Sequence, residues 1–312
     1  MASKNTYLLT DEQRLSLIQI PDDVSDRHLA RYHTLSDQDL NVIHAHRRDH
    51  NKLGFAVQLC LLRFPGRTLA DLPTLPPRVL SNIAAQLELP VSAFEEYGSR
   101  EVTLYEHVKE IRELYGFRNY GWREMIAITR KLLPIAMQNH RPLPLVMKAL
   151  DLMRDSKIIA PGITETERLV TQVLAIADTR IETRLIAHLS DVQKAQLNSL
   201  LQPEATLNGK TPFSWLAQPP QKPSAKSMQK LLQRVKLLKG MNIPALDSSL
   251  HRDRIIELSR KCAKYKSQSL LKLSESKRLA LLVSHITEVT QDLTDEILDM
   301  FDRIMTELMS KG

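Results

Sequence analysis

Glycine, cysteine and aromatic residues are scarce in this chain of 312 residues. It contains nine glycines and two cysteines, and aromatic side chains make up 5% of it. Cys60 and Cys262 have no partners at the spacing of a metal site or a disulfide framework, which suits a reducing compartment. Strong alternation of apolar and polar residues, the pattern of β-strands, is also missing. The sequence therefore predicts an all-α fold.

Long apolar runs are missing as well. No stretch of about 18 apolar residues occurs, and the N-terminus lacks the apolar core of a signal peptide. With 43% hydrophobic and 25% charged residues, the composition is typical of a globular protein. We expect a cytoplasmic protein with no membrane partner and no small-molecule substrate.

Motifs for catalysis and for metal binding are incomplete. The segment Gly116–Arg123 has glycines at the spacing of a phosphate-binding loop, but a Trp-Arg pair stands where that loop needs Lys followed by Ser or Thr. His46 and His50 lie one helical turn apart, but Arg47 occupies the place of the zincin glutamate and no third ligand is suitably spaced. We expect no catalytic residue, no metal site and no cofactor within these 312 residues.

Positive charge is concentrated in one segment. The net charge of the chain is +7, whereas residues 222–281 carry 15 lysines and arginines against four acidic residues, a net charge of +11. Residues 282–312 carry a net charge of −5. Concentrated positive charge is typical of a nucleic-acid partner, although a solvated helical face would have the same composition.

A predicted helix from Ser224 to Lys239 places several of these cations at a spacing of three to four residues, opposite an apolar face. In the basic segment we therefore expect the following contacts to the DNA backbone: Lys222, Lys226, Lys230, Arg234, Arg252, Arg254, Lys261, Lys264 and Lys266.

The stretch from Arg47 to Arg67 has the layout of a helix-turn-helix. A polar corner precedes an apolar helix over about 51–64, which Pro65-Gly66 ends. Its periodicity leaves Asn51, Phe55 and Gln58 on one face together with a glycine that permits a close backbone approach. This face is predicted to enter the major groove. The alternative is an ordinary buried helix whose few polar residues are solvated.

A second helix, over about 100–115, repeats the order of short helix, corner and longer helix. It is either a second groove-reading helix or a plain surface helix with Glu–Arg pairs. The base-reading candidates of the two helices are Asn51, Lys52, Phe55, Gln58, Thr103 and His107. The accompanying backbone candidates are Arg47, Arg48, His50, Arg63, Arg67, Arg100 and Lys109.

Three regions follow from these patterns. Residues 1–70 are predicted to form a first helix-turn-helix module, residues 71–160 a second helical DNA-binding module, and residues 161–312 a further helical, basic region. The third region ends in an amphipathic helix whose apolar stripe must pack against something. The residues of this stripe that are candidates for self-association are Ile297, Met300, Phe301, Ile304 and Leu308.

Four segments of the chain resemble one family of proteins. They are Leu9–Arg14, Leu53–Arg67, Thr211–Leu216 and Asp295–Met305, and the second and fourth are the most specific. On these segments the chain resembles the N-terminal region of the Tn-three family, the large replicative transposases of bacterial resistance transposons.

The resemblance implies successive helical modules that recognise the terminal inverted repeats of a transposon, in a bacterial protein associated with the nucleoid. It also implies an RNase H-like catalytic domain beyond Gly312, with a metal-binding Asp-Asp-Glu triad, so that magnesium is expected only there. The predicted function is thus sequence-specific binding of double-stranded DNA. The alternative is a helical scaffold for self-association with non-specific DNA affinity.

Overall fold

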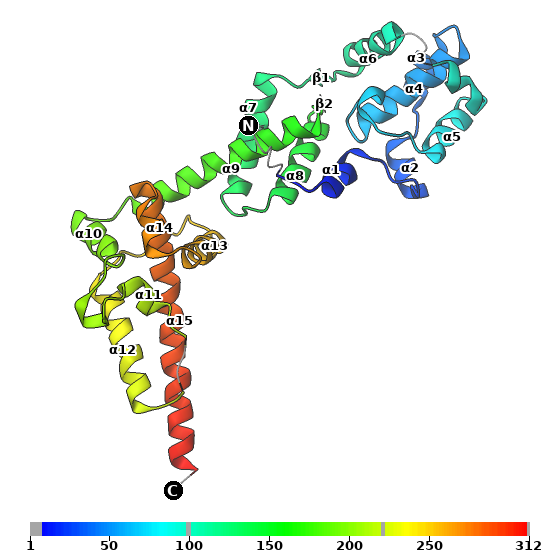
Figure 1. The fold of residues 1–312 in the computed structure, drawn as a ribbon. Coiled ribbons are helices and arrows are strands. Elements are labelled where there is room, and N and C mark those ends of the chain that lie inside the picture. Colours follow the sequence, from blue (N-terminus) through cyan, green and yellow to red (C-terminus); the bar gives the residue numbers. More distant parts are fainter. Residues whose placement is uncertain (1–7, 98–100, 220–221, 311–312) are drawn as a thin grey trace. The chain divides into compact units, whose positions relative to one another are not determined.

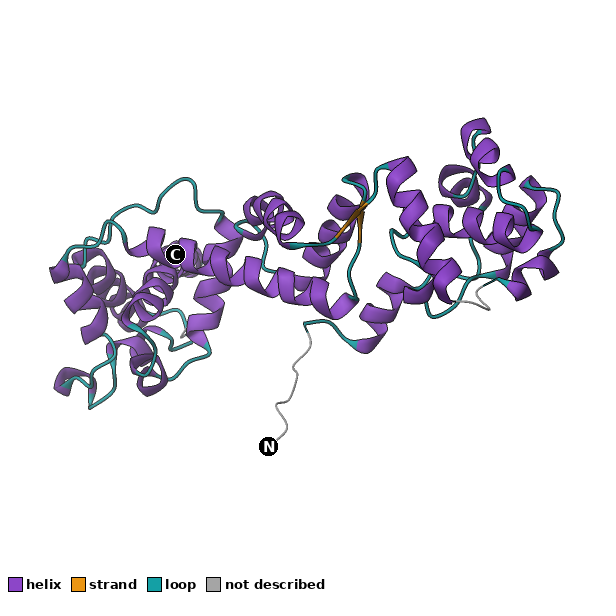
Figure 2. Cartoon of the chain, turned by 90° about the horizontal axis from the view of Figure 1, so that it is seen from above, coloured by secondary structure: helices purple, strands orange, loops and turns teal. Residues whose placement is uncertain are grey.

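The computed structural model describes residues 8–97, 101–219 and 222–310 of the chain (Figure 1). The regular structure of these residues is helical, apart from two strands of two residues each, which pair in parallel (Figure 2). The all-α prediction is confirmed, whereas the tandem helix-turn-helix modules are not. The chain divides into two compact units: unit 1 comprises Met1–Ile135 and Arg141–Leu174, and unit 2 comprises Ala136–His140 and Ala175–Gly312.

Unit 1 contains the elements up to the first half of a long helix, α9, whose second half belongs to unit 2. Their bounds are α1 (Asp11–Ile18), α2 (Asp26–Tyr32), α3 (Asp37–His44), α4 (Asp49–Arg63), η1 (Leu69–Asp71), α5 (Pro77–Gln86), η2 (Val91–Glu96), α6 (Glu101–Tyr115), β1 (Arg118–Asn119), α7 (Trp122–Ala136), α8 (Pro142–Asp155), β2 (Ile158–Ile159) and α9 (Ile163–Ile186).

Helix α4 lies at the centre of the first half of unit 1. Its residues 53–62 are all buried, because they are apolar on nearly every side of the helix. Helices α3, α5 and α6 and the short helices η1 and η2 all contact it. The boundary predicted near residue 70 therefore falls inside one packed cluster, and the boundary predicted at 160 also lies within unit 1.

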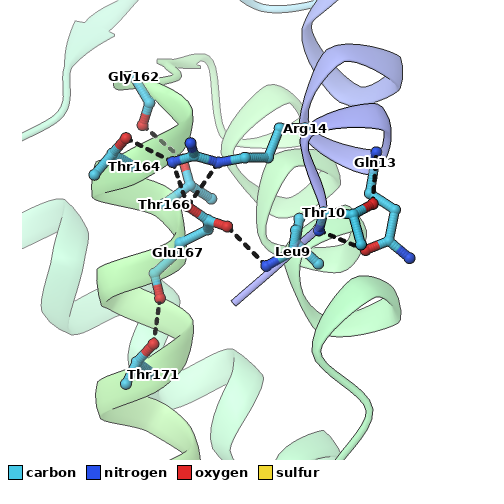
Figure 3. Close-up of polar contacts among 9 residues, drawn as sticks. All are labelled: Leu9, Thr10, Gln13, Arg14, Gly162, Thr164, Thr166, Glu167 and Thr171. Atoms are coloured by element: carbon cyan, nitrogen blue, oxygen red, sulfur yellow. Dashed lines mark hydrogen bonds and ion pairs between the residues drawn. The ribbon is translucent and has the colours of Figure 1, made fainter. Parts of the chain in front are cut away.

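The N-terminal helix is attached to the start of α9 (Figure 3). As its sequence predicts, α1 begins at a capping box of Thr10 and Gln13. The attachment depends on Glu167, which lies near the start of α9. The Glu167 carboxylate accepts a hydrogen bond from the backbone N–H of Leu9 at 3.0 Å and pairs with the Arg14 guanidinium at 2.6 Å. This residue thus joins two segments that are far apart in the sequence.

Unit 2 is built around its last helix, α15. Helices α12 and α13 pack along α15 and bury its residues 279–286 in a common core. Figure 1 shows α12 running beside α15. The bounds of the helices in this unit are α10 (Asp191–Ser199), η3 (Ala205–Leu207), α11 (Pro212–Leu216), α12 (Ala225–Gly240), α13 (Arg252–Ala263), α14 (Ser267–Leu271) and α15 (Glu275–Met309).

The apolar stripe predicted for the terminal helix is split between two faces of α15. Met300 belongs to the core of unit 2, and Ile297 and Ile304 pack against that core. Phe301 and Leu308 are 54% and 62% exposed. Part of the stripe therefore covers the core of its own unit, and the remainder is open to solvent.

Candidate nucleic-acid interface

The predicted groove-reading helix is the most deeply buried helix of unit 1. Because every residue of α4 from Leu53 to Leu62 is buried, only its first turn and Arg63 at its end reach the surface. A helix that is covered by five neighbouring elements cannot enter the major groove. The placement of α4 as the reading helix is therefore corrected: the alternative of an ordinary buried helix describes it.

Two of the predicted base readers on α4 have partners inside the protein. Gln58 is 1% exposed, and its Oε1 atom accepts a hydrogen bond from the backbone N–H of Leu69 at 3.1 Å. Phe55 is fully buried beside the imidazole ring of His107, with 5.4 Å between the ring centroids. Neither side chain is available to a base edge.

The glycine of α4 has an internal role too. A Cβ atom at Gly54 would overlap the ring of Tyr97, which packs directly against the helix backbone. The close approach predicted from this glycine is therefore made by the protein itself. His107 shares this site, because its Nδ1 atom lies 3.1 Å from the Tyr97 hydroxyl. Burial, and secondarily the nearby His46, lower the pKa of His107 to about 4, so this buried ring is neutral near pH 7.

A few of the candidates in unit 1 remain at the surface. Arg47, Arg48 and Lys109 are exposed, and Thr103 is half-buried on α6. Arg100 lies outside the described residues.

The remaining candidates at the start of α4 already have acidic neighbours. Lys52 pairs with Asp49 at 3.0 Å, and His50 pairs with Glu96 at 3.0 Å. Asn51, between them, is half-buried. The charge of Lys52 is partly compensated within the protein, and the imidazole of His50 already has a partner, which weakens the case for phosphate contacts here.

Arg63 and Arg67 hold unit 1 together. Arg63 donates two hydrogen bonds to the Asp39 carboxylate, at 2.8 and 2.9 Å. Although burial alone would raise the pKa of Asp39, the hydrogen bonds from Arg63 and Ser36 lower it to about 2. Arg67 is buried and donates to the carbonyl oxygen of Pro161 at 2.8 Å. Arg67 is therefore corrected from a DNA contact to a structural residue.

Two arginines of the basic segment are likewise internal. Arg254 is 2% exposed and pairs with the carboxylates of Asp178 and Glu257. Arg234 is buried and donates to the backbone oxygen of Gln218 at 3.1 Å and to its side-chain oxygen at 3.2 Å. Both predictions of a backbone contact are corrected, because a guanidinium enclosed by its own chain cannot reach a phosphate.

The other cations of the segment lie at or near the surface of unit 2. Arg252 is exposed and donates to the Gln291 side chain at 2.9 Å. Lys222, Lys226, Lys264 and Lys266 are exposed, and Lys230 and Lys261 are half-buried.

Helix α12 carries the largest net charge among the described helices of the unit. It contains five lysines and arginines and no acidic residue. Its buried face, formed by Leu231, Arg234, Val235 and Leu238, packs toward α15. The opposite face is open and presents Lys226, Gln229, Gln233 and Lys236, which recur at the spacing of one helical face.

Sequence reasoning missed Gln229, Gln233 and Lys236. The prediction placed Arg234 among the outward-facing cations of this helix, but Arg234 is buried, so the open face lies at a different set of positions. The sequence did contain a signal for this face: residues 225–240 include no acidic residue and have two glutamines four residues apart. Gln is a residue type that can read adenine.

Two further properties bear on the chemistry of the described residues. Within them, no group of three His, Cys, Asp or Glu side chains is placed to hold a metal ion. None of the helices in the described ranges is both long and apolar enough to cross a membrane.

Comparison with known proteins identifies the family. Residues 8–173 match the family model described as "Domain of unknown function (DUF4158)". The chain belongs to this family. The DUF4158 match ends one residue before the boundary of unit 1 at Leu174. The basic helix α12 therefore lies outside the DUF4158 region, in unit 2.

Similarity to transposases extends beyond the DUF4158 region. The chain is 34% identical over 312 residues to the transposase for transposon Tn1546 of Enterococcus faecium. This alignment covers 99% of this chain and 31% of the relative. It is 33% identical to the transposase for transposon Tn501 of Pseudomonas aeruginosa and 33% identical to that for Tn21 of Escherichia coli, over 97% of this chain and 30% of each relative. The resemblance to the Tn-three family is thus confirmed. The chain spans about a third of the length of these relatives.

Proposed function

We propose that this DUF4158 chain binds double-stranded DNA at the terminal inverted repeats of a transposon, as part of a transposase that carries out replicative transposition. The observation that carries the proposal is the open face of α12, where lysines and glutamines stand together and acids are absent. The names of the relatives support the association with transposition. The chemistry of the face supports DNA as the partner.

The lysines of α12 suit the phosphates of a duplex. Lys226 and Lys236 are exposed, and no carboxylate of the described chain pairs with either of them. Cations that are not neutralised by their own protein release condensed counterions when they meet DNA, which provides sequence-independent affinity. The packing of α12 on α15 holds these side chains on a rigid support.

The glutamines suit the edges of bases. Gln229 and Gln233 are exposed one helical turn apart, between the two lysines. An α-helix fits the major groove, where the amide of Gln can both donate to and accept from adenine. In this arrangement the lysines fix α12 against the backbone, and the glutamines select the sequence.

A gel-shift titration of the whole chain tests this function. We compare a duplex carrying the terminal repeat with a scrambled duplex at two salt concentrations. The double variant Lys226→Gln/Lys236→Gln is expected to weaken binding to both duplexes alike and to reduce the salt slope by about two. The matched control is Lys210→Gln, which removes an exposed charge elsewhere in unit 2. Equal affinity of the unaltered chain for the repeat and the scrambled duplex would refute sequence-specific recognition.

Self-association is a second candidate function. Leu298, Phe301 and Leu308 are exposed on α15, and with the half-buried Met305 they follow the alternating three- and four-residue spacing of a coiled-coil seam. On this basis a second copy of the chain would cover the seam. Sedimentation of the chain with Phe301→Ser/Leu308→Ser is expected to shift a dimer to a monomer. A monomeric unaltered chain at micromolar concentration would refute this candidate.

A further inference from the structure

Unit 1 has a basic surface of its own, around the start of α7. Residues 116–160 carry eight lysines and arginines against three acidic residues, a net charge of +5. The excess is hidden when charge is averaged over the first half of the chain. It lies in a different unit from α12.

An exposed tryptophan stands in the middle of this surface. The Trp122 side chain is 66% exposed, although indole is among the largest apolar groups of the chain. The Arg123 guanidinium lies 5.3 Å from the centre of the Trp122 ring and covers part of it. Ile126 and Arg130, one and two turns further along α7, are exposed on the same face. The face therefore combines an open aromatic ring, an apolar side chain and two guanidinium groups.

More cations gather beside this face, at the end of α8. Arg118 donates to the backbone oxygen of Ser156 at 3.2 Å, and Lys131 lies 3.4 Å from the Ser156 hydroxyl. Both cations therefore lie at the C-terminal end of α8, where positive charge is favoured. The carboxylate of Glu124 lies 3.6 Å from the Arg118 guanidinium and offsets part of this charge. Arg118, Lys131 and the neighbouring Lys157 all remain exposed, so the local charge stays positive.

We propose that this surface, formed by Arg118, Trp122, Arg123, Arg130 and Lys131, binds single-stranded DNA. Aromatic rings that stack on successive bases, flanked by cations that follow the backbone, are the general means of binding unpaired strands. The uncovered side of Trp122 takes a base, and the guanidinium groups of Arg123 and Arg130 take the phosphates on either side. Bases in a duplex are already stacked on one another, so an open indole suits an unpaired base better than a paired one.

A protein partner fits this surface less well. Trp and Arg are common in protein interfaces, but fully desolvated cations there need acidic partners. A polyanion neutralises this positive surface without requiring a specific acidic protein. The site is separate from α12 and does not depend on the duplex contact proposed there.

Tryptophan fluorescence gives a direct test, because Trp122 and Trp215 are the two tryptophans of the chain. In a Trp215→Phe background, Trp122 becomes the sole reporter. Titration with an oligothymidylate of about ten nucleotides, within the range of single-strand sites, is expected to quench its emission. Arg123→Gln/Arg130→Gln is expected to weaken this binding roughly tenfold and to flatten its salt dependence.

Label anisotropy extends the test to variants without the reporter. Trp122→Ala is expected to lower affinity for the labelled strand roughly tenfold, and Trp122→Phe to restore part of the loss. Lys226→Gln/Lys236→Gln, which disables the duplex contact of α12, is expected to leave the quenching of Trp122 unchanged. These variants are at the surface, and circular dichroism checks their folding.

Three results would overturn the proposal. The first is the absence of quenching by the single strand, which would leave the surface to a protein partner. The second is equal quenching by a duplex of the same length, which would make it a duplex contact. The third is unchanged affinity in Arg123→Gln/Arg130→Gln.

Discussion

Arg63 and Asp39 form a two-point ion pair that fastens the end of α4 to the start of α3. The distances are 2.8 Å from Nη2 to Oδ1 and 2.9 Å from Nη1 to Oδ2, and the Asp39 side chain is almost fully buried. Asp39 also caps α3 by accepting a hydrogen bond from the backbone N–H of Ser36. A side chain predicted to touch DNA thus fixes the corner between two helices.

Removing one partner of this pair should destabilise unit 1. Arg63→Gln leaves a buried carboxylate without its cation, which costs about 3 kcal/mol in the free energy of unfolding. Asp39→Asn should also destabilise, and the double variant should lose less than the sum of the two. Urea unfolding measures all three, with the exposed Arg47→Gln as the control. A chain with Arg63→Gln that unfolds normally but loses DNA affinity would contradict the structural role.

The buried histidines should make unit 1 sensitive to mild acid. Burial, and secondarily the neighbouring His28, lower the pKa of His33 to about 4, and His107 has a similar value. Both rings take up protons near pH 6.5 when unfolded but resist them when folded. The stability that they contribute is therefore complete above pH 6.5 and is lost as the pH falls through 4, on the order of 1–3 kcal/mol for each ring.

Thermal unfolding between pH 7 and pH 4 measures this loss. His107→Phe, which keeps a ring against Phe55 and removes the titrating group, should flatten the profile. His44→Gln, at an exposed position, should leave the profile as it is. Below about pH 4 a further loss of stability is expected. The pKa of Asp39 is lowered in the folded state because its charged carboxylate pairs with Arg63, and protonation of that carboxylate weakens the pair. Stability that is constant from pH 7 to pH 4 would refute the role given to the histidines.

Glu167→Gln should loosen the N-terminal helix. The amide can still accept the hydrogen bond from Leu9, but the charge that attracts the Arg14 guanidinium is removed (Figure 3). We expect faster amide hydrogen exchange in α1 and a loss of about 1–3 kcal/mol in unfolding free energy. The control is Glu165→Gln, two residues away, which removes an exposed carboxylate paired with Arg168. Equal rates of amide hydrogen exchange in α1 for the two variants would show that Glu167 does not hold this helix in place.

Gln229→Ala and Gln233→Ala should relax base preference without much effect on scrambled DNA. Removing an amide that reads a base costs roughly 1–3 kcal/mol of discrimination. Binding to single-base variants of the repeat identifies the positions concerned. Gln58→Ala serves as a contrasting variant, because it is buried in unit 1 and should alter stability rather than base preference. A base preference that depends on Gln58 and not on Gln229 or Gln233 would return recognition to α4.

Several features of this protein follow from its sequence alone. The helical period and the scarcity of glycine determine the all-α fold, and the capping box at Thr10 marks the start of α1. The motifs around Leu53 and Asp295 are sufficient to identify the transposase relatives. These are local properties, since propensity, capping and short motifs depend on neighbours along the chain.

The role of each polar side chain was decided only by the tertiary structure. A single helical period cannot show that α4 is covered on all sides, because its covering elements come from segments as distant as α6. Arg63, Arg67, Arg234 and Arg254 look like DNA contacts in a charge count, yet each meets an acceptor elsewhere in the chain. Burial removes such groups from water and from any partner outside the chain. Helix α12, by contrast, packs against α15 through its apolar face, so that the glutamines and lysines of its opposite face stay in solvent.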